Sequence, residues 1–350
     1  MAQRNAIGLD IGTSVVRAAE LSFGRAGITL ERFGQVVLPE GAVRDGEVVD
    51  PDSVVNGLRQ LWGATGFSHK RVVMGVANQR VIVRQLELPW MTPEELRSSL
   101  AFHVQDVLPI PVEAAVLDFF PLEEVTGEAG NRMLRGLLVA ASRDTVLANV
   151  RCAQQAGLTC QSVDLTSFAV LRSMGRQSGL EVETEALIDV GARVTNIVVH
   201  SAGTPRFVRI LLMGGQDVTD AVAERVGVPT SEAEALKQQV GLVNTAPEAA
   251  AVSRAVNTTA QDFVDEIRGS LDYYAASTPA FRVERILLCG GGSRLEGLRE
   301  RLAAATRLPV VEGDPFSTLR VGNTGLDAHQ IEFVKPLAAV PVGLALGAIR

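Results

Sequence analysis

Residues 6–16 of the 350-residue chain read AIGLDIGTSVV, and residues 185–195 read EALIDVGARVT. In each stretch an apolar β-type run ends in Asp-x-Gly and leads through a short turn into a second β-type run. Asp189 follows Asp10 by 179 positions (189 − 10), which is about half of the chain. One supersecondary plan that occurs twice at this spacing predicts two similar lobes that face each other.

Each Asp-x-Gly turn has the chemistry of a phosphate-binding loop, and we call residues 10–14 the first clasp and residues 189–193 the second clasp. Glycine has no Cβ, so the backbone can lie close to a phosphate, and successive N–H groups of such a turn bind anions. An aspartate can hold Mg²⁺ through water, because Mg²⁺ keeps several of its waters. One such turn alone is more often a plain hairpin turn. Two in matching contexts indicate that Asp10 and Asp189 are Mg²⁺-water ligands beside a phosphate.

A third glycine-rich stretch supports this interpretation. Residues 286–293 read ILLCGGGS, a hydrophobic strand that runs into Gly290, Gly291 and Gly292, and a helix is expected from about Leu295. Three consecutive glycines cost conformational entropy unless something must lie close to the backbone. The alternative is an ordinary strand-to-helix loop. No GxxxxGK[ST] motif is present, which excludes the P-loop class.

The composition fits a globular protein, with 47% hydrophobic and 21% charged residues. Short β-type runs alternate with helical patterns throughout, which predicts an α/β fold. The net charge of −7 argues against nucleic acid as a partner and against direct binding to an anionic membrane. Three cysteines without metal-ligand spacing fit a reduced cytosolic setting. No apolar window reaches the roughly 18 to 20 residues that span a bilayer.

Three further segments carry local predictions. The stretch from Glu123 to Asn131 is polar and contains glycine, which predicts an exposed loop. Asp164 stands just before a helical pattern over residues 165–171, where it fits the N-cap position. The stretch from Pro336 to Ile349 is apolar but interrupted by proline and glycine, and we expect a buried strand, a loop and a final helix over residues 343–349.

The two clasps, the strand-GGG-helix element and the C-terminal helix together resemble the superfamily of actin, sugar kinases and heat-shock chaperones. The resemblance implies an actin-like, ribonuclease H-like duplicated α/β fold with two lobes that binds ATP and Mg²⁺. It implies that the phosphates face the first clasp through Gly12, Thr13 and Ser14 and the second through Gly191, Ala192 and Arg193, and that the adenosine faces Gly290, Gly291 and Gly292.

The segment from Gly214 and Gly215 to Lys237 resembles the second-lobe helix pair of the bacterial actin homologues FtsA and MreB. The resemblance implies that Glu234 and Lys237 reach the ribose and base. A solvated ion pair between residues i and i+3 is the alternative.

The first lobe resembles the PilM family of type IV pilus assembly proteins and, more distantly, FtsA. The stretches VIVRQLELP at residues 81–89 and MTPEEL at residues 91–96 carry this resemblance, which implies a small inserted α+β subdomain over residues 79–135. The other predicted boundaries are 1–78, 136–183 and 325–350 for the first-lobe core, 184–213 and 270–324 for the second-lobe core, and 214–269 for a helical subdomain of the second lobe.

The resemblance to PilM implies an ATP-binding cytoplasmic adaptor that a protein partner holds at the inner membrane. That partner is the N-terminal cytoplasmic peptide of a bitopic PilN-like membrane protein, which lies between the first-lobe core and the insert. Other pilus-assembly components and self-association are compatible with this role. Leu86, Leu88 and Leu100 are candidates for the groove, and ordinary core is the more common role for each.

Two alternatives from the same superfamily stay open. One is a filament-forming cytoskeletal ATPase of the FtsA or MreB type; FtsA-type proteins carry a C-terminal amphipathic membrane helix, which we do not expect here because the sequence ends at Arg350, directly after the final helix. The other is a sugar or acid kinase, which needs a carboxylate aimed at a substrate hydroxyl, and no convincing one is evident.

ATP hydrolysis requires a group that orients or deprotonates the attacking water. The resemblance to actin relatives places that group on the helix before the second clasp, and residues 165–171 contain neither Gln nor Glu. Asp164 is the one weak candidate. We therefore expect at most a slow ATPase, in which ATP is mainly a structural ligand.

Overall fold

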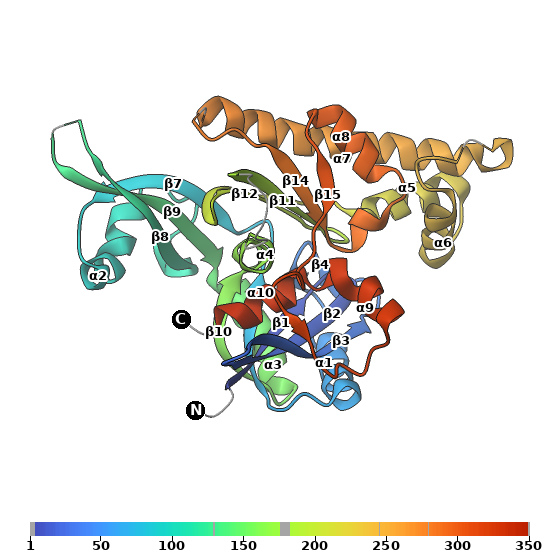
Figure 1. The fold of residues 1–350 in the computed structure, drawn as a ribbon, viewed down its shortest axis with the longest axis horizontal. Helices are drawn as coiled ribbons and strands as arrows, with labels where there is room; N and C mark the ends of the chain where they lie inside the picture. The colour runs from blue at the N-terminus through green and yellow to red at the C-terminus, as the bar shows by residue number, and fades with distance from the viewer. Residues whose placement is uncertain (1–3, 129, 176–182, 245, 279, 349–350) are drawn as a thin grey trace.

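Two mixed β-sheets with helices packed on them form the two lobes of the molecule (Figure 1). The computed structural model describes residues 4–128, 130–175, 183–244, 246–278 and 280–348. The first-lobe sheet has the strand order β10-β6-β1-β2-β3-β16, and the second-lobe sheet has the order β13-β12-β11-β14-β15. The first sheet comprises β1 Arg4–Ile11, β2 Val15–Gly24, β3 Gly27–Val37, β6 Arg71–Val76, β10 Thr159–Leu165 and β16 Arg320–Val321. The second comprises β11 Thr184–Val190, β12 Thr195–Ser201, β13 Thr204–Leu211, β14 Arg285–Cys289 and β15 Val310–Glu312.

The strand pairing confirms the duplication that the clasps predict. In the first sheet β1 pairs antiparallel with β2 and parallel with β6; in the second, β11 pairs antiparallel with β12 and parallel with β14. A further antiparallel strand, β3 or β13, follows in each. The registers agree as well, because Asp10 lies opposite Arg17 and Asp189 lies opposite Asn196.

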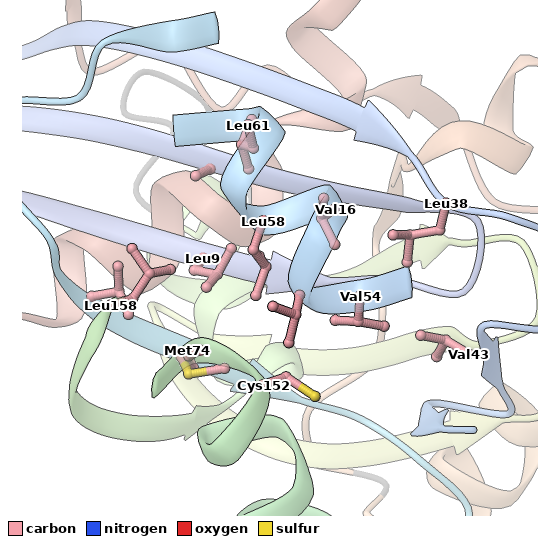
Figure 2. Close-up of a cluster of buried hydrophobic side chains, with 14 of the residues drawn as sticks. Leu9, Val16, Leu38, Val43, Val54, Leu58, Leu61, Met74, Cys152 and Leu158 are labelled. Atoms are coloured by element: carbon pink, nitrogen blue, oxygen red, sulfur yellow. The ribbon is translucent and has the colours of Figure 1, made fainter. Parts of the chain in front are cut away.

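Helix α1 (Pro51–Thr65) covers one face of the first sheet. Asp50 caps its N-terminus by accepting from the backbone N–H of Ser53, and Gly66 ends it in the left-handed conformation. Figure 2 shows Val54, Leu58 and Leu61 pointing from this helix into the same cluster as Leu9 and Val16 of the sheet. Helix α3 (Arg143–Gln155) adds Cys152 to the cluster. The spacing of the buried side chains along α1 is that of one helical face.

Helices α4 (Thr166–Met174) and α10 (Ala339–Gly347) lie where the two lobes meet (Figure 1). Their packing requires two glycines. A Cβ on Gly343 would lie 1.8 Å from the carbonyl oxygen of Ala169 in α4, and a Cβ on Gly8 would lie 2.0 Å from that of Pro341. The surrounding interlobe core draws buried residues from both sheets and both helices, among them Val73, Ala169, Val170, Leu187, Val198, Leu287 and Leu344.

The second lobe packs one long and three shorter helices on its sheet and beside it. The long helix α7 buries Phe263, Ile267 and Tyr274 against the sheet, as the sequence pattern indicates. The helices are α5 Gly215–Val226, α6 Thr230–Val240, α7 Ala250–Ser277 and α8 Leu298–Thr306, with the short 3-10 helices η2 Pro247–Ala249 and η3 Gly291–Arg294. The remaining short elements of the chain are β4 Val43–Arg44, β5 Glu47–Val48, α9 Ala328–Val334 and η4 Lys335–Leu337.

The predicted insert forms a separate three-stranded sheet that projects to one side of the molecule (Figure 1). Its antiparallel order is β7-β9-β8, and a helix packs against it whose N-terminus has a capping box formed by Thr92 and Glu95. Leu88 and Leu100 are buried in its own small core. The elements are β7 Ile82–Pro89, α2 Pro93–Val104, η1 Val112–Ala114, β8 Ala115–Thr126 and β9 Arg132–Ser142. The boundaries of the lobes and the insert stay predictions.

The loop predicted over residues 123–131 is wrong in part. Strand β8 continues to Thr126 and β9 begins at Arg132. Charged side chains extend this hairpin, because Arg132 forms a 2.6 Å ion pair with Glu124 and Arg135 a 3.1 Å ion pair with Glu123. Cross-strand charge pairs of this kind stabilise a hairpin that the sequence pattern alone assigns to a loop.

Two other local predictions are also corrected. Asp164 does not cap α4, whose N-cap is Leu165, because the Asp164 carboxylate forms an ion pair with Arg172. No strand forms over residues 336–342, where η4 leads directly into α10. A helix satisfies its own backbone hydrogen bonds, and the small residues of this stretch allow it to be buried against β1 and α4. Through the described ranges, no helix has the length and apolar character of a bilayer span; α9–η4 and α10 reach that length only as a pair, bent by 75°.

We expect Gly343→Ala to destabilise the protein by about 3 kcal/mol or more, because the added methyl group would meet the backbone of α4 rather than a flexible side chain. Denaturant unfolding measures this change. Gly269→Ala is the matched control: a Cβ there, within α7, meets nothing within 4 Å, and it should raise stability by roughly 0.5–1 kcal/mol. Equal effects of the two substitutions would contradict the packing described for α10.

Candidate nucleotide and metal site

The two clasps have the same backbone geometry. The N–H of Gly12 donates to the carbonyl of Val15 at 3.1 Å, and the N–H of Gly191 donates to that of Val194 at 3.0 Å. A Cβ on Gly12 would lie 2.9 Å from the Val15 oxygen, and one on Gly191 would lie 2.5 Å from the Val194 oxygen. Glycine is therefore required in both turns by the turn itself, before any ligand is considered. Thr13 and Ser14 complete the first turn, and the Ser14 carbonyl accepts from Leu38.

The two clasp aspartates lie close enough for their charges to interact. Burial raises the pKa of Asp10 to about 6; the positive charge of Arg17 opposes this rise, and the carboxylate of Asp189 adds to it. Burial also raises the pKa of Asp189, against the hydrogen bond from Asn196 and the charge of Arg17. Ionising these two buried carboxyls costs free energy, and a bound cation would lower that cost. The site therefore favours a cation.

Mg²⁺ fits this donor set. It prefers oxygen ligands, and it is commonly bound through one or two carboxylates, with water and phosphate oxygens completing its shell. Asp10 and Asp189 supply two such carboxylates. Among the residues that the structure describes, no three His, Cys, Asp or Glu side chains gather into a direct ligand set. The geometry therefore suits a hydrated Mg²⁺ held between the lobes.

Gly290 and Gly292 are required by the second clasp itself. A Cβ on Gly290, whose φ is +87°, would lie 2.4 Å from the carbonyl oxygen of Val190 and 2.7 Å from the Asp189 carboxylate. A Cβ on Gly292 would lie 2.5 Å from the Val190 side chain. A Cβ on Gly291 would approach only Leu337, at 3.8 Å. What lies close to this backbone is the neighbouring clasp, so the glycines do not by themselves indicate a ligand.

Gly214 and Gly215 join the same backbone cluster. The N–H of Gly215 donates to the Gly191 carbonyl at 3.0 Å, and the N–H of Gln216 donates to the Ala192 carbonyl at 2.7 Å. A Cβ on Gly214 would lie 2.4 Å from the Gly191 oxygen. The N-terminus of α5 is thus bonded to the second clasp, and this arrangement fixes the clasp relative to the helices behind it.

Glu234 and Lys237 form an ion pair of 2.6 Å that is buried at its lysine end, while the Glu234 side chain is 38% exposed. The Lys237 side chain is buried, and its Nζ also donates to the Gly215 carbonyl and to the Thr219 hydroxyl, both at 2.9 Å. Burial alone raises the pKa of Glu234, but the hydrogen bonds from Lys237 and Thr219 outweigh it and lower that pKa. The pair anchors α6 to the start of α5.

A pocket of about 900 Å³ opens beside η3. It adjoins the glycine loop but is lined by residues beyond it rather than by Glu234 or Lys237. Its lining includes Leu242, Val243, Ser293, Arg294, Leu295, Glu296 and Gly297.

Two predicted site residues have their side chains committed elsewhere. The Arg193 guanidinium forms ion pairs with Asp217, at 2.8 Å, and with Asp220, both on α5. Burial alone lowers the pKa of Arg193, but these two carboxylates raise it. Asp164 is paired with Arg172, which also donates to the Gly343 carbonyl at 2.9 Å. Arg193 can therefore offer the site its backbone N–H more readily than its charge.

Three residues around the aspartates were given no role by the sequence analysis. Asn196 donates to the Asp189 carboxylate at 3.2 Å, and the Cys289 thiol lies 3.7 Å from its other oxygen. Arg17 lies opposite Asp10 in the sheet. The available signal was position: Arg17 and Asn196 each stand seven residues after a clasp aspartate, on the strand that returns beside it.

The fold and its paired clasps define an actin-like protein. The structure titled PilM-PilN type IV pilus biogenesis complex is similar over 99% of this chain and 98% of that one, with 25% identity and a TM-score of 0.87. MreB5 of Spiroplasma citri bound to AMPPNP shares the fold, with 12% identity, a TM-score of 0.53, and coverage of 99% and 96%. The two-lobed actin-like prediction is confirmed.

FtsA cell division proteins are also similar to this chain in sequence. FtsA of Bacillus subtilis is 24% identical over 67% of this chain, and FtsA of Pseudomonas aeruginosa is 23% identical over 89% of it. These matches span 58% and 83% of the two relatives. The model of the type IV pilus assembly protein PilM family matches residues 8–349, and the chain belongs to that family.

Asp10→Asn should make the ligand-free protein more stable at pH 7.5, by on the order of 2 kcal/mol, because the raised pKa means that ionising Asp10 costs folding free energy. The sign follows from proton binding: the folded chain holds this proton more tightly than the unfolded chain, so stability falls as pH rises from about 4 to above 6. Urea unfolding at pH 4 and at pH 7.5 measures the difference, which should vanish at pH 4. Asp106→Asn, at an exposed carboxylate of the insert, is the control. A variant less stable than wild type at pH 7.5 would refute the prediction.

Proposed function

We propose that this chain binds ATP with Mg²⁺ between its two clasps. The phosphates would lie against the backbone of residues 12–14 and 191–193, with the hydrated Mg²⁺ between Asp10 and Asp189. The loop of residues 290–292 and the Glu234–Lys237 pair would lie on the adenosine side. When bound, Mg²⁺ would offset the negative charge of the phosphates and of the two carboxylates. The support is the matched geometry of the clasps and the raised pKa of both aspartates, to which the charge of Asp189 contributes at Asp10.

ATP in this role would be mainly structural, with slow turnover. Helix α4, which precedes the second lobe, contains no Gln, Glu or Asp over Thr166–Met174. Its two hydroxyl residues nearest Asp189, Thr166 and Ser167, are bonded to Asn196. Asp164 is bonded to Arg172. No side chain of this helix is thus available to deprotonate or orient a water.

The proposed role is that of a cytoplasmic adaptor in type IV pilus assembly. The observation that carries it is the similarity over the full chain, at 25% identity and a TM-score of 0.87, to a protein in a PilM-PilN complex. The partner would be the N-terminal cytoplasmic peptide of a bitopic PilN-like membrane protein, which would hold the chain at the inner membrane. The insert suits such a contact, because it has its own core and projects away from the clasps.

Saturating ATP with Mg²⁺ should stabilise the protein, by about 2.7 kcal/mol at a ligand concentration 100-fold above Kd. Turnover should stay below roughly one per second, the low end of ordinary kcat values. Unfolding in the presence of the nucleotide and a steady-state phosphate-release assay measure the two quantities. Asp189→Asn should lose the Mg²⁺-dependent part of the stabilisation. No stabilisation of the wild type by ATP would refute nucleotide binding, and fast turnover would refute the structural role.

A synthetic peptide of the N-terminal residues of the PilN-like protein should bind the full chain in a calorimetric titration. Hydrogen exchange should then slow within residues 79–135 and along the adjoining first-lobe surface, because bound backbone is protected. A peptide of the same composition in scrambled order is the control. Binding without protection of the insert would contradict the proposed location, and no binding would contradict the adaptor role.

A further inference from the structure

The carboxylate of Asp189 is held by buried donors on both of its oxygens. Asn196 Nδ2 donates to Oδ2 at 3.2 Å, and the Cys289 thiol lies 3.7 Å from Oδ1. Asn196 is only 4% exposed and Cys289 is fully buried. Asn196 sits directly opposite Asp189 in the β11–β12 hairpin, so the sheet itself places the amide beside the carboxylate.

The orientation of the Asn196 amide is fixed from the other side. The hydroxyls of Thr166 and Ser167 donate to its Oδ1 at 3.0 and 2.8 Å. If the amide were turned over, its oxygen would face the Asp189 carboxylate, which repels it, so the arrangement with Nδ2 toward Asp189 is the one that satisfies every group. All three polar residues are buried, where an unmade hydrogen bond is costly.

The two hydroxyls come from the first turn of α4, the helix between the lobes. Thr166 and Ser167 precede Ala169, against which Gly343 of α10 packs. Val170 on the next turn belongs to the interlobe core. The position of α4 between the lobes is therefore linked to the carboxylate of the second clasp. Two hydroxyls of α4 donate to the Asn196 amide, and that amide donates to Asp189.

The first lobe has a different type of residue at the position equivalent to Asn196. Arg17 lies opposite Asp10 as Asn196 lies opposite Asp189. The cross-strand neighbour of Asp10 is thus a positively charged residue and that of Asp189 is a neutral amide, although the charge of Arg17 acts on Asp189 as well. A neutral donor orients a carboxylate without supplying the charge that would compete with a cation. The two clasps therefore share their backbone geometry, but their carboxylates have different cross-strand partners.

We propose that Asn196 is a positioning residue for Asp189 as a ligand of the hydrated Mg²⁺, and that Thr166 and Ser167 make this positioning depend on the interlobe helix α4. A change in the position of α4 between the lobes would then change the Mg²⁺-dependent part of the nucleotide affinity. This inference rests on the proposed binding of ATP with Mg²⁺. Removal of a single partner that orients a metal-binding carboxylate typically lowers metal affinity 10- to 100-fold.

The measured quantity is the Kd of the full chain for a fluorescent ATP analogue, with Mg²⁺ and with EDTA, and the ratio of the two values. Asn196→Ala should reduce the Mg²⁺-dependent gain in affinity about 10-fold and leave the Kd in EDTA unchanged. Ser167→Ala should reduce the gain in the same direction by less. In the Asn196→Ala background, Ser167→Ala should cause no further loss, because the amide through which it acts is gone.

Ser173→Ala is the matched control. Ser173 is a buried hydroxyl on the same helix whose Oγ donates to the Val170 carbonyl at 3.0 Å and does not contact Asn196. Loss of this hydroxyl should leave the ratio of Kd values unchanged even if it lowers the unfolding temperature. Ser167→Ala removes a single oxygen, so it supplies the readout if Asn196→Ala fails to fold.

The outcomes separate this inference from the proposed function. A wild-type chain that binds the analogue neither with Mg²⁺ nor with EDTA overturns the proposed function and the inference with it. A wild-type chain whose affinity depends on Mg²⁺, together with an unchanged ratio in Asn196→Ala and Ser167→Ala, overturns the inference alone. An equal effect of Ser173→Ala on the ratio would assign the change to the general stability of α4 and would also overturn it.

Discussion

The constraint on which this structure depends is the meeting of two like charges between two lobes. Asp10 and Asp189 end equivalent strands of the two sheets; burial raises the pKa of both carboxyls, and the charge of Asp189 adds to the rise at Asp10. Buried like charges push apart whatever carries them. The lobes stay together because an apolar core around α4 and α10 joins both sheets at the same level. Hydrophobic packing between the lobes thus acts against the repulsion between the two carboxylates, and a bound cation would remove that repulsion.

The backbone around this site is crowded before any ligand binds. Gly290, Gly292 and Gly214 all lie where a Cβ would strike the second clasp. The N-terminus of α5 is bonded to the same turn. Such packing holds the turn in one conformation, so that little ordering is left to be done on binding, which is the benefit of a preorganised site.

The sequence alone predicts the repeated clasps and the two-lobed fold, because each clasp is a short pattern whose turn geometry follows from its own residues. It does not predict the partners of the aspartates. Arg17 and Asn196 matter through cross-strand register, and Thr166 and Ser167 matter through the position of a helix between the lobes. The loop predicted over residues 123–131 was wrong in part for the same reason, since Glu124 and Arg132 are informative only once they are known to form an ion pair across β8 and β9. A close approach to the glycine backbone is present at Gly290 and Gly292, where the neighbouring clasp is the cause, and the contact of this loop with adenosine stays a prediction.

The tight seat of α10 has a consequence for how the chain folds as it is made. Gly8 of β1 packs against the backbone of α10, so β1 can meet this covering helix only after the insert and the second-lobe sheet, which lie between the two in sequence, have been synthesised. Contacts so distant in sequence form slowly. Until then one face of the first sheet lacks its apolar cover and is exposed to aggregation, whereas the strands of the insert and of the second-lobe sheet pair within shorter stretches of sequence. The same helix that joins the lobes therefore covers the first-lobe sheet only after the second-lobe sheet has been synthesised.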